Sequence, residues 1–284
     1  MLDRDRIEEA ARVVGAARAL MVGAGAGMGV DSGLPDFRGR QGFWRAYPPF
    51  AKLGLDFEDL ANPQWFARDP GLAWGFYGHR LNLYRATVPH AGYRILLDWA
   101  ARMDLGLFAF TSNVDGHFQR AGYDDERVCE CHGSIHHLQC SCSCQSDIWS
   151  AAELTVTVDP RTFRASCALP KCPSCGTLAR PNILMFGDWG WIPDRTEAQE
   201  QRLGDWLRAV RDVPLAVIEC GAGTGVPTVR WRCEQAAADA GAPLVRINPH
   251  EPGGPDGTIS IAAGALEALR AIDQVLKDMR GASH

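Results

Sequence analysis

Two pairs of cysteines near the middle of the chain most constrain what it can fold into. Cys140 and Cys144 form one pair, and Cys172 and Cys175 form the other. Thiolates at such spacings supply the four tetrahedral ligands that structural Zn²⁺ prefers. Disulfide frameworks are typical of short secreted chains, whereas paired cysteines in a chain of 284 residues more often hold metal. We therefore expect a zinc module in which four protein ligands give the metal a structural role.

The choice of ligands leaves alternatives open. Cys142 lies between the first two cysteines, and alternation along an extended chain would point it away from their side. Cys167 is a second spare thiol. His136 and His137 are adjacent, so on a strand their side chains face opposite ways, and we expect them at the surface and not at the metal.

Outside this module the chain alternates short apolar runs with helical patterns. Helices are expected over residues 6–19 and 72–85, and strands over residues 19–22, 105–110, 214–219 and 243–247. Short apolar strands alternating with helices predict a parallel sheet. The expected fold class is α/β, a Rossmann-like parallel sheet with a smaller zinc-binding and helical lobe.

These elements predict two lobes with a cleft between them. The Rossmann-like lobe takes residues 1–40, 91–135 and 182–284. The smaller lobe takes residues 41–90, a helical insert rich in aromatic residues and proline, and residues 136–181, the zinc module.

Composition excludes some partners. The chain is 46% hydrophobic, carries a net charge of -5 and has no long block of lysine and arginine, which argues against direct nucleic-acid binding. No run of 18 apolar residues and no signal-peptide core is evident, so we expect no membrane association and a cytoplasmic location. A peptide or small molecule is the expected partner, and we expect a monomer.

A glycine-rich turn at residues 23–29 follows the first predicted strand. In a strand-to-helix turn, missing Cβ atoms let backbone N–H groups approach a pyrophosphate, although a tight turn without a ligand has the same pattern. Asp36, Phe37 and Arg38 follow and are suited to clamp a ribose and a nicotinamide. An ordinary dehydrogenase places an acidic residue at the end of a second strand about 20 residues further on, and this chain has none there. We therefore expect chemistry on the dinucleotide itself and not hydride transfer.

Several motifs follow one another in a distinctive order. Residues 33–38 read Gly-Leu-Pro-Asp-Phe-Arg, residues 111–115 read Thr-Ser-Asn-Val-Asp, and His132-Gly133 precedes the cysteines. Residues 181–188 read Pro-Asn-Ile-Leu-Met-Phe-Gly-Asp, and Asn248-Pro249 comes later. With the Gly25-Ala26-Gly27 turn, these motifs resemble the signature of the sirtuin family from about residue 22 to about residue 269.

The resemblance implies an NAD-dependent protein-lysine deacylase that binds an acylated protein or peptide and forms nicotinamide and O-acyl-ADP-ribose. It implies His132 as the general base on the ribose hydroxyls, and an imidazole with a pKa of about 6.5 suits that role. Asn113 and Asp115 are the other implied catalytic residues. The residues alone leave an alternative open: a histidine beside glycine can have a purely structural role, and Asn and Asp also favour helix caps.

The resemblance also implies which residues contact NAD. They are Gly25, Ala26, Gly27, Asp36, Phe37, Arg38, Ser112, Asn113, Asp115, Gly221, Gly223, Asn248 and Ala263. The chain departs from the family at three of its motifs: the usual glutamine is Ser112, a serine after the first turn is Gly29, and a Gly-Thr-Ser motif becomes Gly221-Ala222-Gly223. The two turns lose hydroxyls that the family places around phosphates and ribose, which bears on NAD affinity and turnover.

The helical insert carries a candidate acyl pocket. Tyr77 and Arg80 are three residues apart, so on a helix they share a face, and they resemble the Tyr-x-x-Arg of sirtuins that remove succinyl, malonyl and glutaryl groups. The alternative is an arginine paired with a surface acid. Gly78 between them indicates close packing or ligand approach.

Residues 182–188 are expected to pair with the substrate backbone as an added strand, and the implied substrate contacts are Ile183, Met185, Phe186 and Gly187.

Two rival functions use the same features. A mono-ADP-ribosyltransferase or NAD glycohydrolase would cleave the same bond of NAD and pass ADP-ribose to protein or water. A non-catalytic NAD-binding module would explain the missing hydroxyls, but His132 argues against it.

Overall fold

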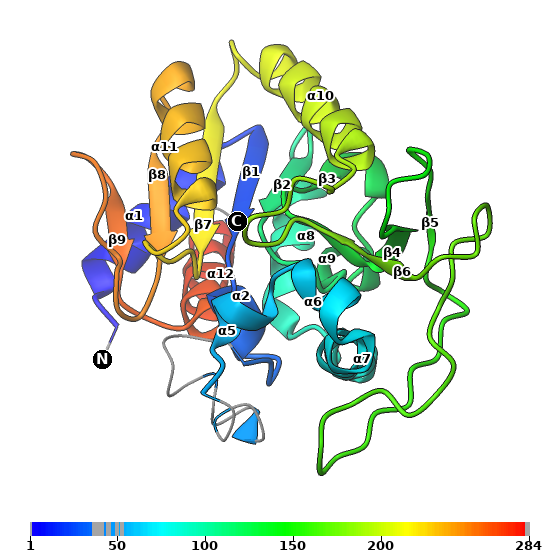
Figure 1. Ribbon diagram of the computed structural model, residues 1–284. Coiled ribbons are helices and arrows are strands. Elements are labelled where there is room, and N and C mark those ends of the chain that lie inside the picture. The colour runs from blue at the N-terminus through cyan, green and yellow to red at the C-terminus, as the bar shows by residue number, and fades with distance from the viewer. Residues whose placement is uncertain (1, 36–42, 44–46, 49–50, 52–53, 282–284) are drawn as a thin grey trace.

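The computed structural model describes residues 2–35, 43, 47–48, 51 and 54–281. Its centre is a six-stranded parallel sheet in the order β3-β2-β1-β7-β8-β9 (Figure 1). The strands are β1 (Ala19–Ala24), β2 (Leu107–Thr111), β3 (Val128–Glu130), β7 (Leu215–Cys220), β8 (Leu244–Ile247) and β9 (Ile259–Ile261). Every residue of β1, β2, β7 and β8 is buried, as expected of parallel strands covered by helices on both faces.

Helices cover both faces of this sheet. Leu20 and Val22 of β1 pack in one hydrophobic cluster with α1 (Arg4–Ala16), α8 (Ala91–Ala100) and α12 (Ala265–Gly281). Ala19 and Met21 pack in another with α10 (Asp194–Ala209) and α11 (Thr228–Ala240). Alternate residues of a strand point to opposite faces, so the two clusters lie on opposite sides of the sheet.

A second, three-stranded antiparallel sheet lies to the right of the first in Figure 1. It consists of β5 (Ile148–Ser150), β4 (Gly133–Cys140) and β6 (Ala179–Ile183). A third hydrophobic cluster joins it to α5 (Phe57–Leu60), α6 (Gln64–Arg68) and α7 (Pro70–Ala86). The short elements α2 (Gly27–Val30), α9 (His117–Arg120) and the 3₁₀ helix η1 (Asp125–Arg127) connect strands of the large sheet.

Asp69 caps the N-terminus of α7, because its side chain accepts a hydrogen bond from the Leu72 amide, and Pro70 takes the first helical position. Its glycines face the segment that precedes β6. A Cβ atom on Gly78 would lie 2.3 Å from Val156 Cγ1, and one on Gly75 would lie 1.9 Å from the Phe163 carbonyl oxygen. Close packing therefore explains the glycine inside the predicted acyl-pocket helix.

The order of strands sets where a ligand can bind. From β1 the chain moves outward to β2 and β3 on one side and later fills the other side with β7, β8 and β9. The boundary between β1 and β7 is thus the topological switch point, where open α/β sheets bind ligands at the carboxyl ends of their strands. The turns at residues 25–27 and 221–223 follow these two strands.

The predicted fold class is confirmed, and each predicted strand lies within two residues of an observed one. The first helix ends at Ala16, earlier than predicted, because Ala17 is extended and leads into β1. The predicted lobe boundaries after residues 135 and 181 cut through β4 and β6, which belong to the small sheet.

Within the described residues, no helix is both long and apolar enough to cross a membrane. Monomeric state and cytoplasmic location stay predictions.

Candidate functional site

The turns after β1 and β7 pack directly against each other. The Gly27 amide donates to the Gly221 carbonyl at 3.0 Å, and Gly221 has a left-handed φ of +64°. A Cβ atom on Gly25 would lie 2.6 Å from Ala222 Cα, and one on Gly27 would lie 2.7 Å from Gly221 Cα. These contacts require glycine at both positions and turn the Gly27 N–H toward the protein. Ala26, between them, is the exposed residue of the turn.

The motif after β2 is tied to the same turn. The Thr111 hydroxyl donates to the Ala24 carbonyl at 2.9 Å and accepts from the Asn113 amide at 3.0 Å. The Asn113 side chain then donates to the Gly25 carbonyl at 2.9 Å. Asp115 is buried, and its carboxylate accepts from the His117 amide at 2.9 Å, at the start of α9. Burial raises the pKa of the Asp115 carboxyl group.

Ten of the predicted site residues line one cavity of about 380 Å³. They are Ala26, Tyr77, Arg80, Ser112, Asn113, Asp115, His132, Ile183, Met185 and Phe186. The cavity therefore joins the glycine turn, the Asn/Asp motif, helix α7 and the segment after β6, which are distant in sequence. Its wall also includes Leu34, Pro35, Val114 and Leu184, which belong to the predicted motifs, and Phe57, Ala61, Tyr84 and Val226, which sequence reasoning missed.

His132 lies between β3 and β4 and is half-buried at the cavity wall. Burial lowers the pKa of its imidazole, because the charged form loses water. The ring is therefore neutral near pH 7, which is the state a general base needs. Its backbone carbonyl accepts from the Leu184 amide at 3.0 Å and so holds the predicted substrate segment beside it.

Three side chains of α7 line the cavity, those of Tyr77, Arg80 and Tyr84. The Arg80 guanidinium is buried, its Cζ atom lies 5.7 Å from the centre of the Tyr77 ring, and its Nε donates to the Tyr84 hydroxyl at 2.9 Å. The Tyr77 hydroxyl is buried and has no hydrogen-bond partner among the residues that the structure describes. Burial raises the pKa of both tyrosines, so their hydroxyls stay protonated. Tyr84 follows Arg80 at i+4, a helical spacing that could have indicated it.

The segment after β6 is held in place by its own backbone. The Phe186 amide donates to the Ala61 carbonyl at 2.9 Å, and the Met185 amide donates to the Asp188 carboxylate at 3.3 Å. Asp188 forms a buried ion pair with Arg180. These amides bond within the protein, so the predicted strand addition would have to use other backbone groups. Gly187 is exposed with a φ of +66° and is not part of the cavity wall.

Other predicted cofactor residues lie around the cavity and not in its wall. Asn248 is fully buried, donates to the Ala222 carbonyl at 2.9 Å and accepts from the amides of residues 250 and 251. Gly223 is half-buried in the turn after β7, and Ala263 packs in the hydrophobic cluster around α12. Asp36, Phe37 and Arg38 lie outside the described residues.

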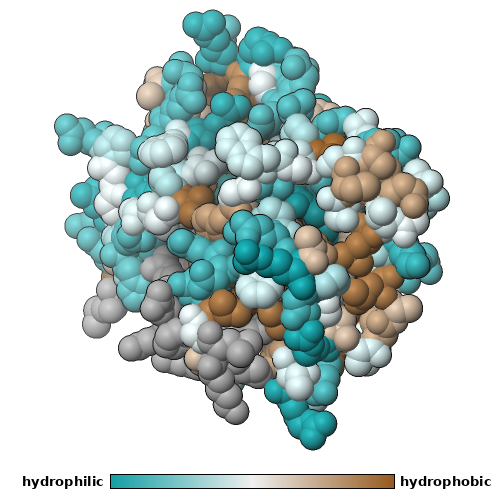
Figure 2. Space-filling model, in the orientation of Figure 1, coloured by the Kyte–Doolittle hydropathy of each residue, from teal (hydrophilic) through white to brown (hydrophobic). Residues whose placement is uncertain are grey.

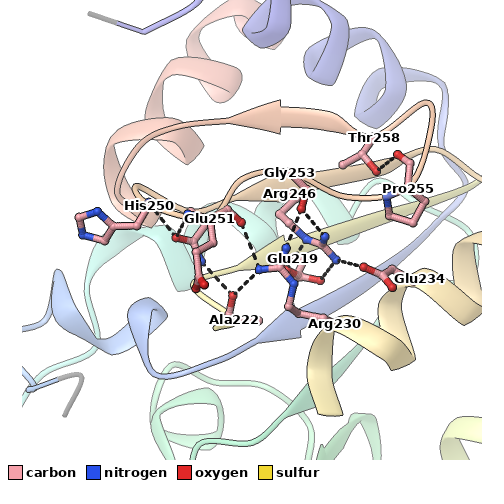
Figure 3. Close-up of polar contacts among 11 residues, drawn as sticks. Glu219, Ala222, Arg230, Glu234, Arg246, His250, Glu251, Gly253, Pro255 and Thr258 are labelled. Atoms are coloured by element: carbon pink, nitrogen blue, oxygen red, sulfur yellow. Dashed lines mark hydrogen bonds and ion pairs between the residues drawn. The ribbon is translucent and has the colours of Figure 1, made fainter. Parts of the chain in front are cut away.

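A buried ion network supports the turn after β7 (Figure 3). Arg246 of β8 forms two hydrogen bonds with the Glu219 carboxylate, at 2.6 and 2.8 Å, and a third with Glu234 at 2.7 Å. Both members of the Arg246–Glu219 pair are fully buried, a state that charged groups reach only when paired. No feature of the sequence pattern predicted this network.

The four predicted metal ligands come together. The sulfur atoms of Cys140, Cys144, Cys172 and Cys175 all lie within 4.8 Å of one another. Zinc with thiolates at about 2.3 Å requires sulfur atoms about 3.8 Å apart, and the Cys140–Cys175 and Cys144–Cys172 distances are both 3.6 Å. The donor set therefore fits a structural zinc ion.

Cys142 does not point away from this cluster, contrary to the prediction. Its sulfur lies 3.4 Å from that of Cys140 and 3.9 Å from that of Cys175. The alternation argument fails because β4 ends at Cys140 and the chain then turns, with a φ of +49° at Ser143. Cys167 lies apart, where its sulfur accepts from the Thr157 amide at 3.3 Å.

The prediction of surface positions for His136 and His137 is also wrong, because both are half-buried. His136 Nε2 forms a 2.9 Å hydrogen bond with the Asp115 carbonyl, which ties β4 to the Asn/Asp motif. Burial lowers the pKa of His137 to about 4. Neither belongs to the four-cysteine cluster.

On the face shown in Figure 2, hydrophobic residues reach the surface in small separate patches among hydrophilic ones. Exposed apolar side chains at the cavity include Leu184, Phe186 and Val226. Scattered exposure of this kind is usual for proteins, so the cavity itself is the feature that distinguishes the surface.

Fold and site define a Rossmann-like nucleotide-binding protein with a four-cysteine module and a cavity at the switch point of its sheet. The model of the Sir2 family, the sirtuins, matches residues 25–201, and the chain belongs to this family. An NAD-dependent protein deacylase of Aeropyrum pernix is 32% identical over 86% of each chain. A Sir2 homologue bound to ADP-ribose is similar with a TM-score of 0.71, at 26% identity over 96% of this chain and 97% of that chain. A Sir2 homologue–NAD complex is similar with a TM-score of 0.68, at 26% identity over 97% and 94%.

Proposed function

We propose that this Sir2-family chain, an NAD-dependent protein deacylase, acts on lysine side chains that carry acidic acyl groups such as succinyl or malonyl. The observation that carries the proposal is the buried guanidinium of Arg80 in the wall of the cavity that also contains His132 and Asn113. A cation at that depth favours an acyl group that ends in a carboxylate.

The electrostatic surroundings of Arg80 support this choice. Its Cζ atom lies between 5.3 and 5.7 Å from the ring centres of Phe57, Phe76, Tyr77 and Tyr84. Aromatic faces stabilise a buried cation, and the pKa of the Arg80 guanidinium is raised, so this side chain stays charged in the cavity wall. Tyr77 adds a buried hydroxyl to the same wall. A carboxylate would gain charge-assisted hydrogen bonds that an acetyl group lacks.

Residues of the cavity wall outside α7, among them Asn113 and His132, suit the NAD-dependent step. NAD, when bound, would supply a ribose carbon that bonds to the acyl oxygen, with nicotinamide as the leaving group. The turns at residues 25–27 and 221–223 would hold its phosphates and ribose at the switch point. Asn113, fixed by the Gly25 carbonyl, would orient a ribose hydroxyl, and the neutral imidazole of His132 would accept its proton.

The role of Arg80 can be tested with matched peptides that differ only in the acyl group. Arg80→Met removes the charge and keeps much of the apolar stem. We expect kcat/KM for succinyl-lysine peptides to fall roughly ten- to hundredfold, the equivalent of a hydrogen bond to a charged group of about 1.5–3 kcal/mol. Activity on acetyl-lysine peptides should persist or rise.

Arg85→Met is the control on the same helix, because Arg85 donates to the Ala151 and Leu154 carbonyls and does not line the cavity. It should leave the ratio of succinyl to acetyl activity unchanged. Equal loss of both activities in Arg80→Met, or a preference of the wild type for acetyl-lysine, would make Arg80 a structural residue.

A further inference from the structure

The carbonyl of Ala222, in the turn after β7, is held by two side chains from different elements. Arg230 of α11 donates to it from Nη1 at 3.2 Å, as Figure 3 shows, and Asn248 donates from Nδ2 at 2.9 Å. Both donors are buried. The carbonyl therefore points into the protein, toward the end of β8 and the first turns of α11.

Arg230 is itself fixed by the loop that follows β8. It donates to the carbonyls of Glu251 at 3.1 Å and Gly253 at 2.6 Å. Arg246, anchored by Glu219, donates to the same Gly253 carbonyl at 2.7 Å. The guanidinium of Arg230 thus joins the turn at residues 221–223 to the loop at residues 251–253, two segments at the carboxyl ends of neighbouring strands.

The planarity of the peptide group transmits this constraint to the next residue. In a trans peptide the N–H points opposite to the C=O of the same unit, and the described residues include no cis peptide bond. Because the Ala222 carbonyl faces Arg230 and Asn248, the Gly223 N–H faces the other way. Among the described residues, a Cβ atom on Gly223 would meet nothing nearer than a Glu251 carboxylate oxygen at 3.7 Å, and Gly223 itself is half-buried, so the turn is not tightly packed at this residue.

We propose that Arg230 is a positioning residue for NAD. By holding the Ala222 carbonyl inward, it presents the Gly223 N–H to an oxygen of the phosphate or ribose groups of NAD. Neither Ala222 nor Gly223 has a hydroxyl. A fixed backbone N–H at the switch point would supply the hydrogen bond that a hydroxyl side chain in this turn would otherwise donate.

The kinetic test is Arg230→Met, assayed with NAD as the varied substrate. Loss of an oriented hydrogen bond to an anionic ligand should raise KM for NAD about ten- to hundredfold while kcat stays within about twofold. Arg230→Lys, which keeps the charge and can reach one carbonyl, should give an intermediate KM. Arg232→Met is the control on the same helix, because Arg232 lies over the Phe110 ring at 5.9 Å, and its KM should match the wild type.

An unchanged KM in Arg230→Met, or a fall in kcat alone, would overturn the proposal. A second measurement does not depend on whether the variant folds. In wild-type protein labelled with ¹⁵N-glycine, saturation with ADP-ribose should shift the Gly223 amide signal and slow its hydrogen exchange. Gly225, exposed in the same turn, serves as the reference and should change less. A Gly223 amide that responds no more than Gly225 would contradict the assignment.

Discussion

Arg80 donates a hydrogen bond from Nε to the hydroxyl of Tyr84 at 2.9 Å, one turn further along α7. The Tyr84 oxygen is therefore an acceptor for Arg80, and its own proton is directed elsewhere. Burial raises the pKa of this hydroxyl, so the proton is retained at neutral pH. Tyr84 lines the same cavity and orients the guanidinium, and under the proposed specificity it would offer a second donor to an acyl carboxylate.

Tyr84→Phe removes only that hydroxyl. We expect kcat/KM for succinyl-lysine peptides to fall by roughly tenfold, the equivalent of a charge-assisted hydrogen bond, with little change for acetyl-lysine. Tyr123→Phe is the matched control, since the Tyr123 hydroxyl donates to the Tyr93 carbonyl outside the cavity wall. If Tyr84→Phe keeps the wild-type ratio of the two activities, Tyr84 takes no part in choosing the acyl group.

His132→Ala should abolish acyl transfer while NAD affinity changes little, because a general base acts on the transition state more than on ground-state binding. The measurements are turnover with an acyl peptide and an NAD titration. Turnover like that of the wild type in this variant would remove His132 from the mechanism.

The pKa of His132 also determines how activity responds to acid. Burial lowers this pKa, so the neutral imidazole persists below the ordinary histidine value of about 6.5. As the pH is lowered, kcat/KM should therefore begin to fall only below about pH 6.5 and should not decline on this side of the profile above that value. An acid limb centred well above 6.5 would show that another group controls activity.

Replacing Cys172 by Ser should release about one equivalent of zinc and lower the melting temperature, because metal binding and folding are coupled. Cys142→Ser should retain zinc if Cys140, Cys144, Cys172 and Cys175 are the ligands. Metal analysis of both variants under non-chelating conditions makes the comparison. If Cys142→Ser loses zinc and Cys144→Ser keeps it, the fourth ligand is Cys142 and not Cys144.

Gly25→Ala should weaken both stability and NAD binding, because its Cβ would lie 2.6 Å from Ala222 Cα, where only backbone movement can relieve the contact. A cost of about 1–3 kcal/mol is typical of such overpacking. Gly225→Ala is the control, since a Cβ there meets no atom of the described residues within 4 Å. Equal melting temperatures for the two variants would contradict the account of the paired turns.

Residues at the ends of strands were the most predictable part of the site. Asn113 and Asp115 follow an apolar run, His132 follows the next strand, and carboxyl ends of parallel strands share one edge of a sheet. Local pattern and the resemblance to the sirtuins were therefore enough to bring them together. The predicted cysteines needed only their spacing and the chemistry of zinc.

Other features depend on neighbours that no local pattern specifies. The contact of Gly25 with Ala222 exists because β1 and β7 are adjacent strands, although they are far apart in the chain. Cys142 was misjudged because the end of β4 could not be located from alternation. Tyr84 was missed because its role requires knowing which face of α7 borders the cavity.

The most direct test of the account is product analysis with purified protein, NAD and a succinyl-lysine peptide. The account predicts free nicotinamide, unmodified lysine peptide and O-succinyl-ADP-ribose in equal amounts, with faster turnover than for the matched acetyl peptide. Free ADP-ribose with the acyl peptide intact would indicate an NAD glycohydrolase, and ADP-ribose attached to protein would indicate a transferase. Either result, or no turnover of any acyl peptide, would contradict the account.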